Sequence, residues 1–442
     1  MGRPPEAEGS ACMSDRKIRQ ALLQRAFDAA VAAAHPGQCL VPHLPPPPER
    51  GRLIVLAAGK AAASMSAVAD AYYRNQHGLS EDRLIGLAVT RHGYGEPVGS
   101  LPVIEVGHPV PDEKGLEATE RTLSLAKEAG DEDLVLVLLS GGGSANWIAP
   151  ANGLPLADKQ ALTRALLRSG ATIQEINTVR KHLSRIKGGR LAQLAAPARI
   201  LTLAISDVPH DDPAVIASGP TVPDPSTLAD ARDVLRRRGI EPPESIRTIL
   251  ENPSAETPKP GDTVFQRSEY RIIAQPSDAV AAAAQVLEHE GYEALVLGAD
   301  IEGEARVVAS EHARIARDLA AQGRRAAVIS GGELTVTING EGRGGPNQEY
   351  ALALALALDG TPGIAAIAAD TDGTDGGSGA PTDPAGAMID ETTLLRARAL
   401  GLDPATLLVD NDSTHFFEGL GDLLTPGPTR TNVNDCRIIL IG

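Results

Sequence analysis

Short apolar runs alternate with longer amphipathic segments along the first half of the chain. Apolar runs of strand length cover residues 53–57, 84–89, 103–106, 134–139 and 200–205. Segments with helical spacing of apolar positions cover residues 15–34, 114–129, 157–169 and 171–194. Continuous apolar strands separated by helices are typical of a parallel sheet covered on both faces. The pattern therefore predicts an α/β domain.

The same alternation returns after a proline-rich segment at residues 242–261. Strands are predicted at residues 271–273, 294–297, 326–329, 364–369 and 437–441, with helices at 277–290, 303–322, 350–358 and 392–400. Proline-rich segments between periodic regions mark domain boundaries. We therefore expect two α/β domains with mostly parallel sheets, at residues 13–240 and 262–442. The first twelve residues fall outside the pattern and are expected to be a disordered leader.

Two of the predicted strands end in Ser-Gly-Gly. Successive glycine N–H groups in a turn form a concavity that binds anions, and open α/β sheets bind ligands where their strands end. Tight strand-to-helix turns are the alternative interpretation. We predict nucleotide or phosphate binding by Ser140, Gly141, Gly142, Gly143 and Ser144 in the first turn and by Gly331, Gly332 and Glu333 in the second, and the sequence leaves open which turn holds the triphosphate.

A second glycine-rich loop, residues 339–345, precedes a predicted helix that opens with Pro346, Asn347 and Gln348. A helix N-terminus preceded by glycines and by Arg343 is typical of an anion site. The loop also matches G-x-G-x-x-G, and Asp370 ends the next apolar run, so an NAD-dependent oxidoreductase is a competing hypothesis. Against it, the strand before the loop has the pattern of a hairpin arm that turns at Asn339-Gly340.

Three further cations stand in positions that favour anionic ligands. Lys60 follows the strand at 53–57 and opens a helix, although no Ser or Thr follows it as a Walker A motif requires. Lys181 and Arg185 are spaced i, i+4 on the helix predicted at 171–194, where like charges repel unless an anion compensates them. We predict that Lys181 and Arg185 contact substrate; a solvated basic face is the alternative.

Aspartates follow two of the predicted strands. Asp207 follows the strand at 200–205, and Asp370, Asp372 and Asp375 follow the strand at 364–369. Carboxylates at strand ends suit Mg²⁺ or a general base. The second cluster resembles a calcium loop, but Pro381 stands where such a loop needs Glu. We assign Asp207 as base or orienting group and the other three to a metal; capping and turn formation are the alternative.

Composition narrows the classes of protein that fit. The chain has 442 residues, 42% of them hydrophobic, which is enough for large cores, and a net charge of −16. The acidic balance argues against a nucleic-acid groove or an anionic membrane surface as main partner. Three cysteines without paired spacing indicate a reducing compartment. No apolar run is long enough for a membrane span, so we expect a cytoplasmic protein. A homo-oligomer is compatible with the sequence.

The motifs together resemble a known family. AAGKAAASM, LLSGGGSA, NTVRKHLSRIKGGRLA, SDVPHDDPAVIASGPTVPDP, SGGELTVTINGEGRGGPNQEYALALAL and DTDGTDGGSGAPTDPAGAMID occur in this order. The chain from Asp15 to Gly442 resembles the class II glycerate 2-kinases, which carry a C-terminal MOFRL domain. One departure is the segment QPSD at 275–278, where an Asn-x-Asp type of turn is expected.

The resemblance implies a function and a site. It implies ATP-dependent phosphorylation of D-glycerate to 2-phosphoglycerate with Mg²⁺, by a Rossmann-like N-terminal domain and a MOFRL-type C-terminal α/β domain. The active site is expected in the cleft between them, and the favoured active-site cations of the family fall on Lys60 and Arg343. Members of the family have also been labelled hydroxypyruvate reductases, so NAD(P)H-dependent reduction of hydroxypyruvate is the alternative function.

Overall fold

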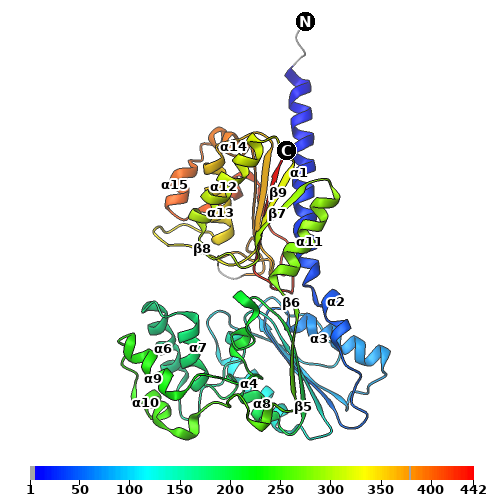
Figure 1. The fold of residues 1–442 in the computed structure, drawn as a ribbon, viewed down its shortest axis with the longest axis vertical. Helices are drawn as coiled ribbons and strands as arrows, with labels where there is room; N and C mark the ends of the chain where they lie inside the picture. Colours follow the sequence, from blue (N-terminus) through cyan, green and yellow to red (C-terminus); the bar gives the residue numbers. More distant parts are fainter. Residues whose placement is uncertain (1–4, 378–379) are drawn as a thin grey trace. The chain divides into compact units, whose positions relative to one another are not determined.

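The computed structural model describes residues 5–377 and 380–442 and separates into two units (Figure 1). The first unit comprises Cys39–Ile273. The second comprises Ala274–Gly442 together with the N-terminal segment up to Gln38. Among the described helices, none is long and apolar enough to cross a membrane.

The first unit is built on a six-stranded sheet in the order β3-β2-β1-β4-β5-β6. Neighbouring strands from β3 to β5 pair in parallel, as predicted. β1 and β4 are buried along their whole length because helices cover both faces of the sheet, which explains their unbroken apolar sequences LIVLAA and LVLVLL. The strands are β1 (Leu53–Ala58), β2 (Leu84–Arg91), β3 (Val103–Val106), β4 (Leu134–Leu139), β5 (Arg199–Ile205) and β6 (Ser268–Ala274).

Several helices of the first unit begin at a side-chain cap. The Asp112 carboxylate accepts a hydrogen bond from the N–H of Gly115 at the start of α4, and Thr172 and Glu175 form a capping box at the start of α7. The helices of the first unit are α3 (Ala62–Ala71), α4 (Glu113–Lys127), α5 (Gly143–Asn146), α6 (Leu156–Arg168), α7 (Ile173–His182), α8 (Arg190–Ala195), α9 (Leu228–Arg237) and α10 (Glu244–Glu251). The short helix α2 (Pro36–Cys39) lies where the two units join in sequence.

The prediction of a single helix at residues 171–194 is wrong. The chain leaves helical conformation after His182 and resumes it only at Arg190. Gly188 and Gly189 both adopt left-handed backbone conformations, with φ of +60° and +80°. A left-handed pair of residues cannot continue a right-handed helix, so α7 and α8 are separate.

The proline-rich segment does not separate the two units. Ile246 and Leu250 of α10 are buried in one apolar cluster with residues of α6, α7 and α9. The first unit therefore continues through the segment at 242–261 and ends at Ile273, later than the expected domain end at residue 240.

The second unit contains a mixed six-stranded sheet in the order β13-β12-β11-β14-β9-β7. β7 and β9 pair in parallel, whereas β14 pairs antiparallel with both β9 and β11, and β12 pairs antiparallel with β11 and β13. The strands are β7 (Glu293–Gly298), β9 (Ala326–Ser330), β11 (Ile364–Asp370), β12 (Gly386–Asp390), β13 (Leu423–Leu424) and β14 (Asp435–Ile441). A separate pair is formed by β8 (Gly303–Glu304) and β10 (Leu334–Thr335).

The helices of the second unit include one that is buried on nearly every side. α13 (Pro346–Leu358) is rich in Ala and Leu and forms a core with α12 and the sheet, which explains its uniformly apolar sequence. The other helices are α11 (Pro276–His289), α12 (Ala305–Ala321), α14 (Thr393–Ala399), α15 (Pro404–Val409) and α16 (Ser413–Leu420).

The first helix, α1 (Pro5–Ala33), belongs to the second unit, although we expected residues 13–240 to form the N-terminal domain. It lies alongside α11 (Figure 1). The Arg16 guanidinium lies 2.6 Å from the Asp390 carboxylate and 2.8 Å from that of Asp422. α1 also begins at Pro5, within the twelve residues expected to be disordered; residues 1–4 lie outside the described part.

Candidate functional site

The strand order of the first sheet reverses between β1 and β4, and the loops that follow these two strands meet. The N–H of Lys60 donates to the carbonyl oxygen of Gly141 over 2.8 Å, and the N–H of Ala61 donates to Oγ of Ser140 over 2.9 Å. Open α/β sheets bind ligands at such a reversal point. The structure therefore places the predicted cation and the first predicted glycine turn side by side.

Close approach of the two loops requires glycine at position 59. Gly59 has φ of +122°, and a Cβ atom there would lie 2.3 Å from Oγ of Ser140. Gly142 is also left-handed, with φ of +83°, and its N–H precedes the short helix α5. A Cβ atom at Gly142 would lie 3.1 Å from the His108 ring and 3.6 Å from Cγ of Lys60. The turn is thus packed against the Lys60 side chain itself.

Ser144, the last predicted residue of this turn, is held by a strained loop. Its Oγ lies 2.7 Å from Oγ of Ser218, which donates to the Asn177 side chain over 3.2 Å. Ser218 and its neighbour Ala217 have φ of +61° and +50°, although neither is glycine. Non-glycine residues in this region cost free energy and cluster at functional sites.

A cavity of about 410 Å³ opens beside this turn within the first unit. Gly142 and Ser144 line it, together with His108 and several apolar side chains. Among the described residues, those that line it include no carboxylate and four Lys or Arg side chains, namely Lys159, Arg164, Arg180 and Lys187. The cavity is therefore suited to an anionic small molecule.

Two of these cations are buried lysines. Nζ of Lys187 donates to the carbonyl oxygens of Ser144 and Trp147 over 2.8 and 3.1 Å, and Nζ of Lys159 donates to that of Leu183 over 3.2 Å. Burial lowers the pKa of Lys187 well below its usual range. Burial also lowers the pKa of Lys159 to about 7, and the nearby guanidinium group of Arg180 contributes.

The two cations predicted to contact substrate already have carboxylate partners. Nζ of Lys181 lies 3.4 Å from the buried Asp224 carboxylate, and Arg185 pairs with Glu120. Because α7 ends at His182, Lys181 and Arg185 do not share a helix face. Their neighbours Arg180 and Lys187 line the cavity instead. The glycine pair after Lys187 was the signal in the sequence that could have shown the helix break.

Asp207 lies two residues beyond the end of β5 and is partly exposed. Burial raises the pKa of Tyr270, and the negative charges of Asp212 and Asp207 add to this effect. Asp207 does not line the 410 Å³ cavity. Its role as a base therefore stays a prediction.

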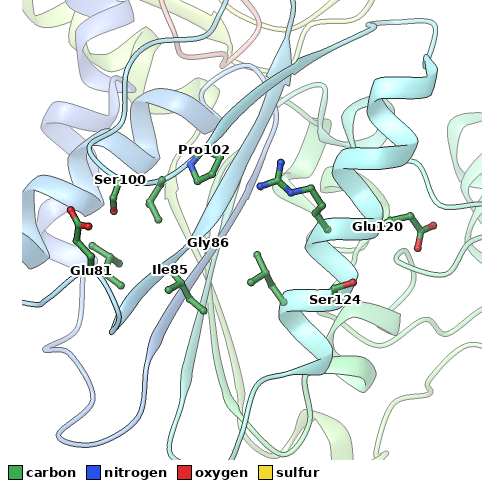
Figure 2. Close-up of a pocket in the computed structure, with 11 residues that line it drawn as sticks. Glu81, Ile85, Gly86, Ser100, Pro102, Glu120 and Ser124 are labelled. Atoms are coloured by element: carbon green, nitrogen blue, oxygen red, sulfur yellow. The ribbon is translucent and has the colours of Figure 1, made fainter.

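A different hollow, of about 630 Å³, lies against β2 and α4 of the first unit. Figure 2 shows Glu81, Ser100 and Pro102 on one side of β2, with Glu120 and Ser124 on α4 across the hollow. No residue that the sequence analysis singled out lines this hollow, and its charges are mixed. It is therefore not the candidate site.

The second Ser-Gly-Gly turn, in the second unit, is packed against its own chain. Gly332 has φ of +100°, and a Cβ atom there would lie 2.2 Å from backbone atoms of Ile301. The buried Arg437 donates to the carbonyl oxygen of Gly331 over 2.5 Å and to Oγ of Ser330 over 3.3 Å. Glu333 is exposed beyond the turn. Close packing in this turn therefore explains why glycine is found at these positions. Phosphate binding by this turn stays a prediction.

The N-terminus of α13 is capped by an aspartate of the chain. The N–H groups of Asn347 and Gln348 each donate to the Asp375 carboxylate over 2.9 Å. Burial raises the pKa of Asp375 to about 7, although these two N–H donors act in the opposite direction. Phosphate binding by Asn347 and Gln348 stays a prediction, and in this structure the Asp375 carboxylate already accepts from both of their N–H groups.

The predicted metal cluster does not form. Asp375 has both carboxylate oxygens engaged at α13, Asp370 accepts from the N–H of Asp372 over 2.8 Å, and Asp372 accepts from the N–H of Thr374 over 2.7 Å. Within residues 5–377 and 380–442, no group of three or more His, Cys, Asp or Glu side chains is placed to hold a metal ion. Turn formation, the alternative reading, accounts for these contacts.

The loop that carries Arg343 uses its glycines for close packing. Cβ atoms at Gly340 and Gly345 would lie 2.3 Å from the carbonyl oxygen of Asp410 and 2.4 Å from that of Asp375. The Arg343 side chain is 69% exposed, and its guanidinium lies 3.4 Å from the Glu418 carboxylate. Arg343 is thus presented to solvent on a rigid loop.

The G-x-G-x-x-G match is not a dinucleotide fingerprint in this fold. The fingerprint places its glycine turn and its acidic residue on neighbouring parallel strands. Here the strand before the glycine loop is β10, which pairs with β8 in a separate two-stranded sheet, whereas β11, which ends in Asp370, lies in the six-stranded sheet. The structure therefore removes the main sequence argument for NAD binding.

Two family models match the chain: "Domain of unknown function (DUF4147)" over residues 22–251 and "MOFRL family" over residues 326–435. A protein of Agrobacterium vitis named "Putative hydroxypyruvate reductase" is 48% identical, over 97% of this chain and 96% of its own. The "D-glycerate 2-kinase" of Thermotoga maritima is 42% identical, over 88% of this chain and 91% of its own.

Structural similarity points the same way. The crystal structure of a glycerate kinase from Thermotoga maritima superimposes with a TM-score of 0.84 at 40% identity, and the match covers 96% of this chain and all of that one. The order of the two family models also agrees with the order of the two predicted domains. The chain therefore belongs to the class II glycerate 2-kinase family, which combines a DUF4147 domain with a MOFRL domain.

Proposed function

We propose that the chain phosphorylates D-glycerate with ATP and releases 2-phosphoglycerate and ADP. The observation that carries the proposal is the contact between Lys60 and the Ser140–Ser144 turn at the reversal point of the first sheet. Phosphoryl transfer needs cations and N–H dipoles around the transferred group, and this corner of the sheet supplies both. The glycerate kinases among the relatives support the same reaction.

In the proposed reaction, the C2 hydroxyl oxygen of glycerate attacks the γ-phosphorus of ATP. The new O–P bond forms as the bond between the γ-phosphorus and the β,γ-bridging oxygen breaks, and the hydroxyl proton passes to Asp207. Lys60 is proposed to stabilise negative charge on the phosphoryl oxygens, and Arg343 is proposed as a further active-site cation. Both cations are positions that the family resemblance favours, and each lies on a loop fixed by backbone contacts.

The predicted Mg²⁺ site fits the structure poorly. Mg²⁺ needs oxygen ligands with free lone pairs, and one or two carboxylates usually suffice beside nucleotide phosphates. Asp375 fails this requirement because it caps α13, and Asp372 is buried in a turn. Asp370 is the one of the three that is partly exposed. No step of the proposed reaction is assigned to a metal held by this cluster.

Reduction of hydroxypyruvate by NAD(P)H is the second candidate function. The name of the relative that is 48% identical favours it. The pairing of β10 with β8 in a separate sheet disfavours it, because the glycine loop and Asp370 then do not follow neighbouring parallel strands, as a dinucleotide site requires.

One pair of assays on the purified protein separates the two functions. ADP formation is measured with D-glycerate, ATP and Mg²⁺, and NADH and NADPH oxidation are measured with hydroxypyruvate. We expect glycerate-dependent ADP formation and no reductase activity. Oxidation of either cofactor without ADP formation would overturn the proposal in favour of the reductase.

A further inference from the structure

The 410 Å³ cavity contains buried basic side chains for which the described residues supply no counterion. Burying a charge without a partner is costly, and a neighbouring like charge adds to the cost. Lys159 and Lys187 are buried, and Arg180 acts on both of them. Among the described residues, no carboxylate pairs with any of these three cations.

Three cations of the same region that lie outside the cavity do have carboxylate partners. Lys181 pairs with Asp224, Arg185 with Glu120, and Lys259 lies 2.7 Å from Glu256. Each of these has a carboxylate partner, although all three lie close in sequence or space to α7. The lack of carboxylates is therefore a property of the cavity and not of the whole region.

The cavity also has the size and lining of a ligand site. Its volume lies within the range of about 300–1,000 Å³ that is typical of small-molecule pockets. Apolar side chains such as Ile148 and Leu167 make up much of its wall, and the cations converge from α6, α7 and the segment after α7. Gly142, which lines the cavity, has Lys60 as a neighbour in space.

On these grounds, and on the basis of the proposed function, we infer that the cavity binds an oxyanion of one of the two substrates, with Arg180 and Lys187 as the residues that hold it. The shared chemistry is a carboxylate or phosphate group. Its source is either the carboxylate of glycerate or the polyphosphate of the nucleotide.

Binding of an anion here should take up protons. An anion beside Lys159 and Lys187 favours their charged forms, which burial disfavours in the empty cavity. The other charged or titratable groups that face these lysines are Arg180 and Arg185, with His108 and Arg164 across the cavity.

The test measures binding of D-glycerate alone and of a non-hydrolysable ATP analogue alone by calorimetry. The variants are Arg180→Gln and Lys187→Met, with Arg236→Gln as control because Arg236 lies outside the cavity and pairs with Asp233 at the surface. We expect the two variants to raise the dissociation constant of one of the two ligands by roughly 10- to 100-fold, which is the effect of losing one charge-assisted hydrogen bond. The control variant should bind both ligands as the wild type does. The ligand that is weakened identifies the source of the oxyanion.

A second readout separates binding from a structural effect. Calorimetry of the wild type at pH 8 in buffers of different ionisation enthalpy should show proton uptake on binding, and Lys159→Met should reduce it. If Arg180→Gln and Lys187→Met bind both ligands as tightly as the wild type does, the inference is overturned, whether or not the wild type is a kinase. Conversely, if ligand binding depends on Arg180 but the protein has no kinase activity, the cavity is still an anion-binding site and the proposed kinase function is wrong.

Discussion

The backbone N–H of Lys60 and the carbonyl oxygen of Gly141 share a hydrogen bond of 2.8 Å. The bond joins the loop after β1 to the loop after β4 and involves no side-chain atom. Replacing the Lys60 side chain should therefore leave the two loops in place. The ammonium group can be removed without dismantling the site around it.

Lys60→Ala should lower kcat for glycerate phosphorylation by roughly 10²- to 10³-fold, the scale of losing one preorganised group that stabilises transition-state charge. Steady-state ADP formation measures it, and the thermal unfolding midpoint should stay near that of the wild type. Lys127→Ala, at an exposed lysine of α4, is the control and should keep full activity. A Lys60→Ala enzyme with kcat within threefold of the wild type would exclude Lys60 from the chemical step.

Arg343→Ala should lower kcat by roughly 10³-fold, the scale of arginines that stabilise phosphoryl transfer. Its side chain is mostly exposed, so protein stability should hardly change. Glu418→Ala, which removes its carboxylate neighbour, should keep kcat near the wild-type value. Near-normal turnover by Arg343→Ala would remove the arginine from the mechanism.

Asp207→Asn should lower kcat by roughly 10²-fold or more if Asp207 accepts the hydroxyl proton, because general bases contribute on that scale. KM for glycerate should change little, and the acidic limb of the pH–rate profile should flatten. Asp212→Asn lies in the same loop and serves as control. An unchanged pH profile in the Asp207 variant would assign the base to another group.

Gly59→Ala should lower both activity and the thermal unfolding midpoint. The added Cβ would lie 2.3 Å from Oγ of Ser140, at a φ that L side chains rarely adopt. Gly239→Ala is a matched control because Gly239 also has positive φ but has no heavy atom within 4 Å of the added Cβ. Equal losses of stability in the two variants would show that contact with Ser140 is unimportant.

Protein stability should fall as pH rises from about 4 to about 7, in part because of Asp375. Burial raises its folded pKa from 3.8 to about 7, so in this interval the folded state binds more protons than the unfolded state. Urea unfolding at pH 5 and pH 8 measures the loss. In Asp375→Asn, which cannot titrate, the loss should be smaller; an identical loss would mean that Asp375 is ionised throughout.

The sequence predicted the first sheet well because its strands are apolar on both faces. Runs such as LIVLAA and LVLVLL fit only buried parallel strands, and the structure confirms them as β1 and β4. Lys60 and Ser140 were each predicted as site residues, but their contact was not, since it depends on which strands become neighbours. Strand order is a property of tertiary packing and leaves no local pattern.

The candidate site was predicted less well where it depends on contacts between side chains that are far apart in the sequence. Asp375 caps a helix that begins at Pro346, and local patterns such as D-x-D-G cannot show which distant N–H groups a carboxylate accepts. Lys181 and Arg185 were chosen over Arg180 and Lys187 because a continuous helix was assumed. The left-handed Gly188 and Gly189 cannot belong to a continuous helix, and in the structure Arg180 and Lys187 line the cavity instead.

The membership of α1 in the second unit sets an order of events during synthesis. The helix emerges from the ribosome before residues 39–273, but its partners, α11 and the strands of the second sheet, follow only after those residues. At about 5–20 residues per second that interval is on the order of tens of seconds. Throughout it Leu23 and Phe27, which are buried in the finished protein, have no native surface to cover them. We therefore expect a chaperone or transient contacts to cover this helix until residues 274–442 are made.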